Sequence, residues 1–329
     1  MSAAVGTALV LASALTLMPA AWAGAAPRVA AAGNHDLTLM VEGQARTFVV
    51  HVPPGFGTLG PLPVVLAFHG GGGNARGFQA YANLDALADR TGFVVVYPDG
   101  SGLLARRLLT WNAGGCCGAA QARGVDDVGF VLALLRDLAA DLPLDASRVY
   151  ATGHSNGAMM AYRLAAEASE HIAAIAPVAG AMMVERFAPR QPMPVLHIHS
   201  VDDPRALYAG GLGPPFPGTS TRVTHRPVVD GLARWIALDQ CAAEPRRADF
   251  RRAPAHSSEH TATLLTYGPC TSGAVVAHWR LTGAGHGWPG SRSPLPERIM
   301  GPDTTVLDAA EEIWRFMQRF SRPAAPPLR

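Results

Sequence analysis

One short stretch, Gly153-His154-Ser155-Asn156-Gly157, constrains the fold of this chain more than any other. An apolar run at 149–151 precedes it and apolar residues at helical spacing follow it at 158–165, which predicts a strand, a sharp turn and a helix. The pattern Gly-x-Ser-x-Gly is typical of a nucleophilic serine on such a turn. Glycines on both sides remove Cβ atoms that would clash. A serine that only caps the helix is the alternative, and the flanking strand and helix favour the nucleophile.

A serine nucleophile needs a base, and the base needs an acid that orients it. The apolar strand expected at 194–199 is followed by Asp202 and Asp203, and we expect Asp203 to be the acid, although both aspartates are also common turn residues. His286 lies between two glycines near the end of the chain and is the candidate base. The order Ser155, Asp203, His286 is that of α/β-hydrolases. His154, inside the turn, is expected to pack rather than react.

A glycine-rich segment, His69-Gly-Gly-Gly-Gly-Asn74, follows the continuous apolar strand expected at 63–68. A phosphate-binding loop would require a Gly-Lys-Ser/Thr sequence, and this chain contains no lysine. The other interpretation is part of an oxyanion hole. We expect the backbone N–H groups of Gly71 and Asn156 to be its two donors, because the start of the helix after Ser155 directs N–H groups toward developing negative charge.

Aromatic and amide side chains on the loops around the expected nucleophile form a candidate substrate pocket. These residues are Trp111, Asn112, Tyr208 and Trp288. Aromatic side chains at such positions line acyl or aryl pockets. Packing within the protein is the alternative for each of them.

A second cluster of side chains, around the strand expected at 194–199, has a metal site as an alternative interpretation. His197 and His199 alternate onto one face of a strand and Asp202 and Asp203 follow, a set that resembles ligands of a divalent ion. The strand is expected to be buried, and the order of serine, acid and histidine already accounts for the aspartate. We therefore expect no metal.

Apolar segments of two periodicities alternate along the chain. Further strands are expected at 37–41, 46–52, 93–97, 172–178, 261–266 and 275–281, and helices at about 78–90, 126–140, 228–238 and 305–320. Segments 101–125 and 204–225 have no periodicity and are expected to be loops. Strands that alternate with helices predict a mostly parallel, doubly wound sheet. The expected fold is an α/β-hydrolase fold in a single catalytic domain at 34–322, with a linker at 24–33 and a disordered tail at 323–329.

The amino terminus resembles an export signal. Residues 3–17 are apolar, and Ala21-Trp22-Ala23 offers a small-x-small cleavage site, so we expect a signal peptide at 1–23 and a secreted or periplasmic protein. The apolar run is short for a membrane span, so no membrane attachment is expected after cleavage. A net charge of only +2 implies no nucleic-acid partner.

Four cysteines fit an oxidising compartment. Cys241 and Cys270 flank an arginine-rich segment that is expected to be looped, and a disulfide between them would close it. Cys116 and Cys117 are adjacent, and either a disulfide or two thiols is compatible with the sequence. No second cysteine pair has the spacing of a zinc site.

Several segments together resemble the secreted polyhydroxybutyrate depolymerase-like family of α/β-hydrolases, which includes feruloyl and acetylxylan esterases. The segments are His69-Gly-Gly-Gly-Gly-Asn74, Tyr97-Pro-Asp-Gly100, Trp111-Asn-Ala-Gly-Gly-Cys-Cys117, Val125-Asp-Asp-Val-Gly-Phe130, Gly153-His-Ser-Asn-Gly157 and Gly285-His-Gly-Trp-Pro-Gly290. The resemblance covers about 36–320. It implies the α/β-hydrolase fold, a Ser-Asp-His triad, no cofactor and a disulfide between Cys241 and Cys270.

One departure from that family concerns the loop after the acid. The family usually has His-Gly-Thr-x-Asp followed by an apolar run, whereas this chain has His199-Ser-Val-Asp-Asp203-Pro-Arg-Ala-Leu-Tyr208. From the motifs and the family resemblance together, the chain is expected to be a secreted serine esterase that acts on 3-hydroxyalkanoate polyester or oligomers. A feruloyl or acetylxylan esterase acting on acylated polysaccharide is the second possibility. An acyltransferase and an inactive binding protein with a hydrolase fold are further alternatives.

Overall fold

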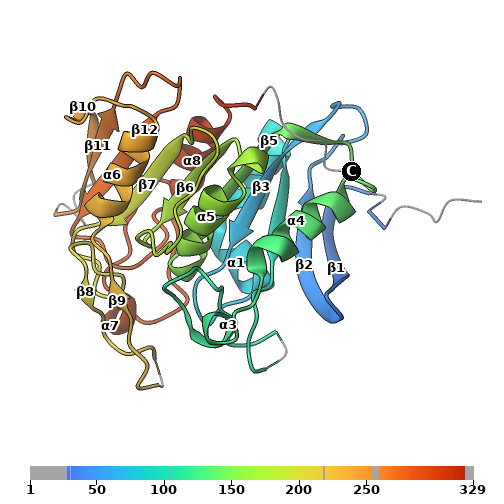
Figure 1. The fold of residues 1–329 in the computed structure, drawn as a ribbon, viewed down its shortest axis with the longest axis horizontal. Coiled ribbons are helices and arrows are strands. Elements are labelled where there is room, and N and C mark those ends of the chain that lie inside the picture. The colour runs from blue at the N-terminus through green and yellow to red at the C-terminus, as the bar shows by residue number, and fades with distance from the viewer. Residues whose placement is uncertain (1–27, 30, 105, 218, 254–258, 323–329) are drawn as a thin grey trace, which may run out of the picture.

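Continuous apolar segments become the middle strands of a ten-stranded sheet that lies between two layers of helices (Figure 1). The computed structural model describes residues 28–29, 31–104, 106–217, 219–253 and 259–322. Across the sheet, the strands are β1 (Gly33–Val41), β2 (Gln44–Val52), β4 (Val94–Pro98), β3 (Leu62–Phe68), β5 (Leu144–His154), β6 (Ala174–Val178), β7 (Val195–Ser200), β12 (Val276–Thr282), β11 (Thr261–Tyr267) and β10 (Arg246–Arg252). Strands from β4 to β12 in this order pair in parallel. The expectation of a mostly parallel central sheet is confirmed.

Helices cover both faces of this sheet, as Figure 1 shows, with α4, α5 and α6 on the near side and α1 and α8 on the far side. The helices are α1 (Ala75–Ala82), α2 (Leu84–Thr91), α3 (Gly118–Ala122), α4 (Asp127–Leu138), α5 (Asn156–Glu167), α6 (Val228–Leu238), α7 (Glu297–Met300) and α8 (Ala309–Met317). A short ladder joins β8 (Gly211–Leu212) and β9 (Thr224–His225) in the expected loop after β7. None of the described helices has the length and apolar character that crossing a bilayer requires.

Two apolar cores, one on each face, explain why the central strands are apolar throughout. In β3, Val64 and Leu66 pack with α4, α5 and α6, whereas Val65 and Ala67 pack with α1, α2 and α8. Alternate side chains of a strand point to opposite faces, so a strand with helices on both sides has no polar face. The same arrangement brings the carboxyl ends of the parallel strands to one edge of the sheet, the lower edge in Figure 1.

Three expectations about the elements were wrong. The helix expected at 78–90 is two helices, α1 and α2, which meet at Asn83 with a φ of 59°. Asparagine is one of the few residues that tolerate this left-handed conformation. The arginine-rich segment expected to be a loop contains the edge strand β10, whose side chains are mostly exposed and so show no apolar alternation. Segment 101–125 includes the short helix α3.

The expected linker at 24–33 is also corrected where the structure describes it. Gly33 is the first residue of β1, Val29 is buried, and Arg28 forms ion pairs with Asp137 and Asp141 of the α4 region. This part of the chain is therefore packed against the domain. The expected signal peptide at 1–23 and the expected tail at 323–329 lie outside the described residues.

The expected disulfide between Cys241 and Cys270 is confirmed, and the adjacent Cys116 and Cys117 are also joined. The first bridge ties the end of α6 to the turn between β11 and β12. Its two cysteines are also paired through their backbones in an isolated β-bridge.

Replacing Cys241 and Cys270 together by alanine is expected to lower the free energy of unfolding. The bridge joins positions 29 residues apart, and closing a loop of that length in the unfolded chain stabilises the folded state by about 3–4 kcal/mol. Urea unfolding of the oxidised proteins measures the difference. Reductant applied to the double variant is the control, because any remaining effect then belongs to Cys116–Cys117. An unchanged unfolding midpoint in the double variant would contradict the expectation.

Candidate active site

Ser155 lies on the turn between β5 and α5, with φ 57° and ψ −119°. The two flanking glycines are required by close backbone approach. A Cβ on Gly153 would lie 2.6 Å from the carbonyl carbon and oxygen of Gly157, and a Cβ on Gly157 would clash with the carbonyl oxygens of Phe68 and His69. A positive φ is an unusual conformation for a serine, and the surrounding packing holds it. The turn raises the serine hydroxyl above the carboxyl edge of the sheet.

Three side chains from distant parts of the chain meet at this turn. The Nε2 atom of His286 lies 2.8 Å from Ser155 Oγ, and its Nδ1 atom lies 2.7 Å from Asp203 Oδ2. His286 is held by its own backbone N–H, which donates to the Met300 carbonyl at 2.5 Å. The structure thus brings together the three residues that the sequence analysis grouped.

The two neighbouring aspartates have different environments. Asp203 is buried, and its Oδ1 atom accepts hydrogen bonds from the backbone N–H groups of Arg205 and Ala206 at 2.7 and 2.9 Å. Asp202 is exposed and instead accepts the N–H of Gly283 at 2.7 Å. Only Asp203 contacts His286, so the geometry distinguishes two carboxylates that the sequence leaves adjacent.

The Asp203 carboxyl group is electrostatically suited to stay ionised. Burial by itself would raise its pKa, but the charge of His286 and hydrogen bonds from His199 and His286 outweigh burial and bring the pKa below its ordinary value. An ionised Asp203 requires a proton on His286 Nδ1. The Nε2 atom that faces Ser155 is then free to accept the hydroxyl proton.

Two backbone N–H groups close to Ser155 have no backbone acceptor among the described residues. Asn156 is the first residue of α5, so its N–H has no carbonyl partner one turn earlier. Gly71 is its neighbour: a Cβ built on Gly71 would lie 3.6 Å from Asn156 Cβ and 3.5 Å from the Phe216 ring. Among the backbone hydrogen bonds of the described residues, neither N–H has an acceptor. The sequence analysis expected these two N–H groups to be the donors of an oxyanion hole.

The Asn156 side chain holds the start of α5 in place. It is buried, its Oδ1 atom accepts the N–H of Trp111 at 2.7 Å, and its Nδ2 atom donates to the carbonyl of Trp111 at 3.1 Å. The loop at 101–125 is therefore bonded to the helix that carries the candidate donor.

Two aromatic residues expected in the substrate pocket lie in the interior instead. Trp111 is 0% exposed, packs edge-on against Phe68 at 5.2 Å, and donates its indole N–H to the His69 carbonyl at 3.0 Å. Trp288 is 1% exposed and packs edge-on against Phe78 at 5.4 Å. The rings of Trp111 and Trp288 fill space in the core, so the prediction that they line the substrate pocket was wrong.

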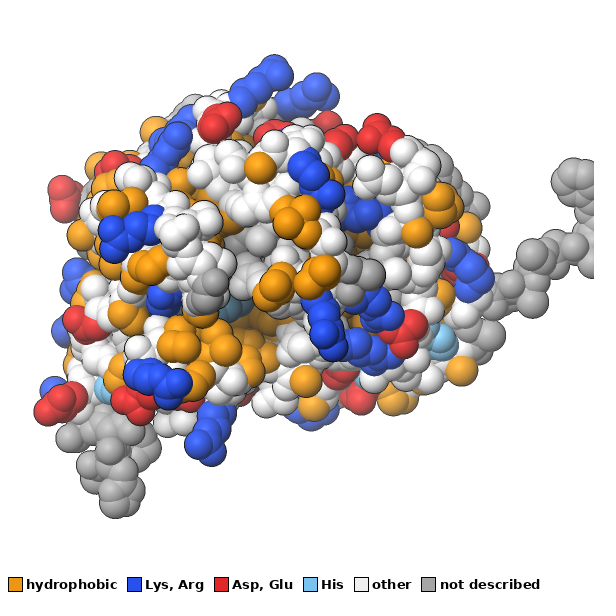
Figure 2. Space-filling model, turned by 90° about the horizontal axis from the view of Figure 1, so that it is seen from below, with side chains coloured by type: hydrophobic (Ala, Val, Ile, Leu, Met, Phe, Trp, Pro, Cys, Tyr) orange, Lys and Arg blue, Asp and Glu red, His pale blue; other side chains and the backbone are white. Residues whose placement is uncertain are grey.

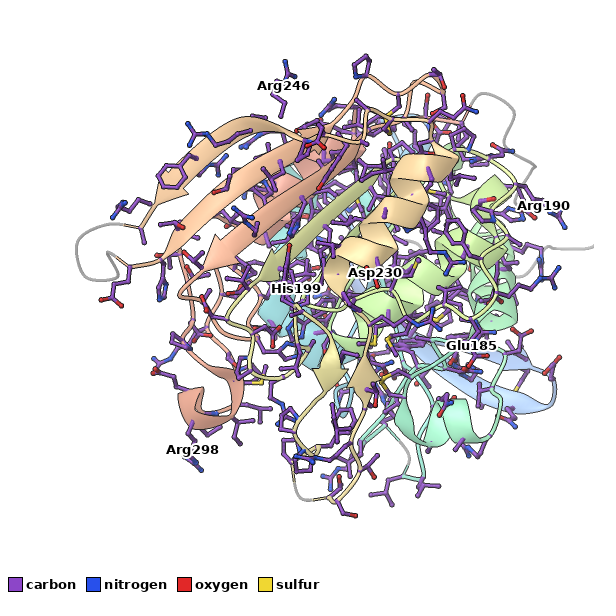
Figure 3. All side chains as sticks on the ribbon, turned by 60° about the vertical axis from the view of Figure 1, so that its left-hand side comes forward. Glu185, Arg190, His199, Asp230, Arg246 and Arg298 are labelled. Atoms are coloured by element: carbon purple, nitrogen blue, oxygen red, sulfur yellow. A yellow bond between two sulfur atoms is a disulfide. The ribbon has the colours of Figure 1, made fainter. Side chains whose placement is uncertain are left out.

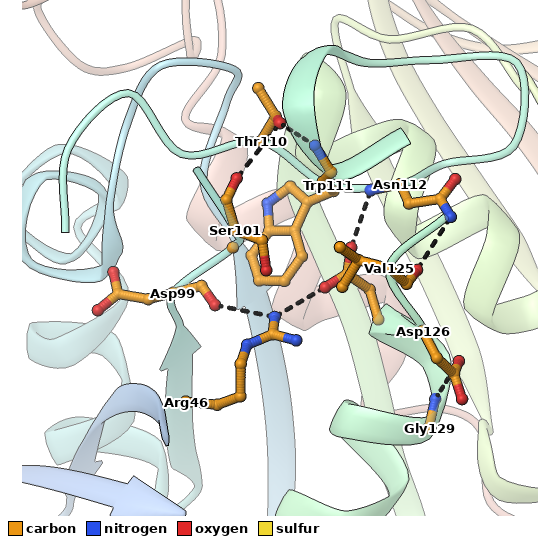
Figure 4. Close-up of polar contacts among 12 residues, drawn as sticks. Arg46, Asp99, Ser101, Thr110, Trp111, Asn112, Val125, Asp126 and Gly129 are labelled. Carbon is orange, nitrogen blue, oxygen red and sulfur yellow. Dashed lines mark hydrogen bonds and ion pairs between the residues drawn. The ribbon is translucent and has the colours of Figure 1, made fainter. Parts of the chain in front are cut away.

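The other two pocket candidates make hydrogen bonds within the protein. Asn112 Nδ2 donates to the Val125 carbonyl at 2.9 Å, and the Asn112 backbone N–H donates to Asp127 at 2.8 Å (Figure 4). The hydroxyl of the half-buried Tyr208 lies 3.1 Å from His278 Nε2. These contacts give Asn112 and Tyr208 a structural role in their loops.

A buried ion pair that the sequence analysis did not predict supports the loop at 101–125. Arg46 of β2 lies 2.7 Å from Asp127 of α4, and the Arg46 guanidinium also donates to the Asp99 carbonyl at 3.3 Å (Figure 4). Burial raises the pKa of Asp127, although Arg46 acts in the opposite direction. Asp126 caps α4, accepting the Gly129 N–H at 2.8 Å, and Asp127 is free for Arg46.

An apolar cluster beside the nucleophile was also missed. Met159 of α5 and Met183 pack with the joined pair Cys116–Cys117, and Phe216 and Val223 complete the cluster. The only sequence signal for Phe216 is a single aromatic residue within the Gly/Pro-rich 209–225 segment. Figure 2 views this edge of the molecule and shows a hollow with hydrophobic side chains beside it and arginines around it.

Buried histidines near the site are expected to make stability depend on pH. Burial lowers the pKa of His69 to about 4 and those of His154 and His278 to about 3. In the unfolded chain they titrate near 6.5. Between these values the unfolded state binds more protons than the folded state. The contribution of these histidines to the free energy of unfolding is therefore fully present above pH 6.5 and decreases as the pH falls toward 4. As the pH falls well below 6.5, the loss measured by urea unfolding should approach about 1.4 kcal/mol per pH unit for each histidine. A constant unfolding free energy from pH 7 to pH 5 would contradict this.

The strand order, the serine turn and the contacts of Ser155, His286 and Asp203 together define an α/β-hydrolase. Solved structures with this fold include an acetyl xylan esterase from Aspergillus awamori, which has a TM-score of 0.55 and 14% identity over 87% of this chain and 99% of that chain. The dienelactone hydrolase-like phosphotriesterase P91 from metagenomic libraries has a TM-score of 0.53 and 15% identity over 89% of this chain and 100% of that chain. Residues 46–247 match the model of the family described as Esterase PHB depolymerase, and the chain belongs to this family.

Several relatives of known sequence are named as esterases, which supports a carboxylic ester hydrolase. A putative esterase NocK of Nocardia uniformis subsp. tsuyamanensis is 30% identical over 85% of this chain and 81% of its own length. The bifunctional acetylxylan esterase/xylanase XynS20E of Neocallimastix patriciarum is 28% identical over 74% of this chain, and feruloyl esterase B of Piromyces equi is 26% identical over 73%. The match spans only 31% and 42% of the latter two proteins.

Proposed function

We propose that the protein is a serine esterase in which Ser155 is the nucleophile, His286 the general base and Asp203 the orienting acid. Ser155 Oγ attacks the ester carbonyl carbon while its proton passes to His286 Nε2. The N–H groups of Gly71 and Asn156 donate to the oxyanion that forms. His286 then protonates the departing alcohol. A water molecule, deprotonated by the same histidine, releases the acid from Ser155.

The observation that carries this proposal is the unbroken line of hydrogen bonds from Ser155 Oγ through His286 to Asp203, at 2.8 and 2.7 Å. The metal-site alternative has less support, because the ring nitrogens of His197 and His199 take part in hydrogen bonds to neighbouring side chains and the Ala206 carbonyl. Within the described part of the chain, no group of three or more His, Cys, Asp or Glu side chains is arranged to hold a metal.

The first test is covalent. A fluorophosphonate probe should label the wild-type protein at Ser155 and leave a Ser155→Ala variant unlabelled. Peptide mapping of the adduct identifies the residue. An unlabelled wild-type protein with no esterase activity would favour a hydrolase-fold binding protein instead.

For the substrate, we propose oligomers of 3-hydroxyalkanoates, which the family description supports. Acylated plant polysaccharide is the second candidate, because named relatives are acetylxylan and feruloyl esterases. A panel of 3-hydroxybutyrate oligomers, methyl ferulate, acetylated xylan and p-nitrophenyl esters of rising chain length separates the two. Release of free acid in water, rather than transfer to an added alcohol, distinguishes a hydrolase from an acyltransferase. A kcat/KM highest for methyl ferulate or acetylated xylan would replace the first candidate by the second.

We also propose that the protein is exported. The support is the apolar segment at 3–17 with its Ala21-Trp22-Ala23 site, together with two disulfides that fit an oxidising compartment. Amino-terminal sequencing of protein recovered outside the cytoplasm is expected to begin at Gly24. A mature protein that keeps residues 1–23 would overturn this proposal.

A further inference from the structure

A line of buried polar side chains continues behind Asp203, away from Ser155. The carboxylate Oδ2 atom of Asp203 lies 3.1 Å from Nε2 of His199, whose Nδ1 atom lies 3.0 Å from Nε2 of His197. His197 Nδ1 in turn lies 2.9 Å from the hydroxyl of Tyr162 on α5. The side chains of Tyr162, His197 and His199 are each at most 1% exposed. Figure 3 shows His199 in the interior, whereas Arg246 and Arg298 project outward.

The acceptors at the Asp203 end determine where the protons of this line lie. His199 Nε2 faces two groups without protons, the Asp203 carboxylate and the Ala206 carbonyl at 2.8 Å, so it carries a hydrogen. In the neutral ring, Nδ1 of His199 is then an acceptor and Nε2 of His197 is its donor. Nδ1 of His197 accepts from the Tyr162 hydroxyl. The hydrogen bonds from Tyr162 to His197 and from His197 to His199 therefore run toward Asp203. The Nε2–H of His199 donates to the Ala206 carbonyl at 2.8 Å, and the Asp203 carboxylate lies 3.1 Å from the same nitrogen.

The surroundings favour the neutral form of the His197 ring. Burial, together with the nearby His199 and His278, lowers the pKa of His197 well below its ordinary value. Tyr208 packs edge-on against His199 at 5.8 Å, and the backbone carbonyl of His197 lies 3.1 Å from His278 Nδ1. No described acid other than Asp203 forms an ion pair with His197 or His199.

We propose that Tyr162, His197 and His199 form a positioning relay that aims Asp203 at His286. The proposal rests on the catalytic roles proposed above for Ser155, His286 and Asp203. Two backbone N–H groups hold Oδ1 of Asp203, and Oδ2 is shared by His286 at 2.7 Å and His199 at 3.1 Å. His199 thus limits rotation of the carboxylate and takes part of its charge. The Tyr162–His197 pair keeps His199 in the tautomer that can do so.

A matched pair of substitutions separates this role from simple packing. In His199→Gln the side-chain amide nitrogen can reach the position of Nε2 and donate to Asp203, whereas in His199→Asn the shorter side chain cannot. We expect kcat of His199→Asn to fall by about 10–100-fold, as for other residues that orient a catalytic group, with little change in KM. His199→Gln should retain most of the wild-type kcat. His199→Phe, which keeps a ring without a donor, should behave like His199→Asn.

The pH profile gives a second readout. With one donor lost, more of the Asp203 charge faces His286 and favours its protonated form. In the Asn and Phe variants, the acid limb of kcat/KM should therefore move up by roughly one pH unit, and in the Gln variant it should stay near the wild-type position. His154, His225 and Arg205 also act on the Asp203–His286 pair. They are unchanged in every variant, so their effects cancel in the comparison.

The outcomes are distinguishable from a failure of the proposed function. Ser155→Ala that abolishes activity, combined with wild-type kcat and acid limb in folded His199→Asn or His199→Phe, would overturn the relay alone. Equal losses in His199→Asn and His199→Gln that follow their melting temperatures would also overturn it, because packing would then explain them. If a folded Ser155→Ala protein retains full esterase activity, the proposed function itself fails. A higher kcat for Gln than for Asn, with an acid limb that moves only in Asn, supports the relay.

Discussion

A Ser155→Ala variant is expected to lose kcat by about 10⁶-fold in ester hydrolysis. The hydroxyl oxygen is the atom that would form the acyl-enzyme, and among the described residues its one side-chain hydrogen bond is to His286 at 2.8 Å. The fold should survive, because alanine has the same Cβ as serine and adds no clash to a backbone already held at a φ of 57°. Activity on p-nitrophenyl butyrate and a melting temperature for each protein measure both quantities.

Ser321→Ala is the matched control for this variant. Ser321 is exposed and follows the last helix of the described chain, far along the sequence from the serine turn. It should keep wild-type activity and melting temperature. Full esterase activity in a folded Ser155→Ala protein would refute Ser155 as the nucleophile. Residual activity above the uncatalysed rate remains compatible, since the N–H donors and substrate binding still act.

Asp203→Asn is expected to lower kcat by about 10⁴-fold. Asparagine has nearly the same shape, but its amide can donate to His286 Nδ1. His286 then carries its proton on Nε2, facing Ser155, and cannot accept the hydroxyl proton. The negative charge that stabilises the imidazolium is also lost. The fall should appear mainly in kcat, because no binding contact to the substrate is removed.

Asp202→Asn is the internal control, since it changes the adjacent residue in the same chemical way. Within the described part of the chain, the Asp202 carboxylate accepts only the Gly283 N–H, at 2.7 Å, and an asparagine oxygen can accept the same bond. Its kcat should remain within about twofold of wild type, as for most surface substitutions. Equal losses in the two variants, or a larger loss in Asp202→Asn, would assign the acid role elsewhere.

Much of the fold could be predicted because helices on both faces require strands without polar alternation. β3 and β4 are such strands, and α6 begins and ends at Val228 and Leu238, where its apolar periodicity begins and ends. Prediction failed where local pattern does not carry the information. Asn83 interrupts a helical pattern through its own backbone conformation, and β10 pairs at the edge with exposed charged side chains that resemble a loop.

Some features of the candidate site could likewise be predicted from the sequence and others could not. The glycines around Ser155 could be predicted, because backbone contact between β5, α5 and β3 leaves no room for a Cβ. The positions of Trp111 and Trp288 could not, because a ring on a loop fills either the core or a pocket according to which neighbours leave space. Phe216 approaches Gly71 from a segment with no periodicity at all.

The sequence by itself determined the strained serine turn and the order of Ser155, Asp203 and His286, because these depend on residue type and on position along the chain. Tertiary structure decided which of two adjacent aspartates faces His286, and it joined Tyr162 of α5 to His197 and His199 of β7. The physical reason is that hydrogen bonds select among side chains by distances of a few tenths of an ångström. Such distances are set only when the sheet, its helices and the loop after β7 pack together.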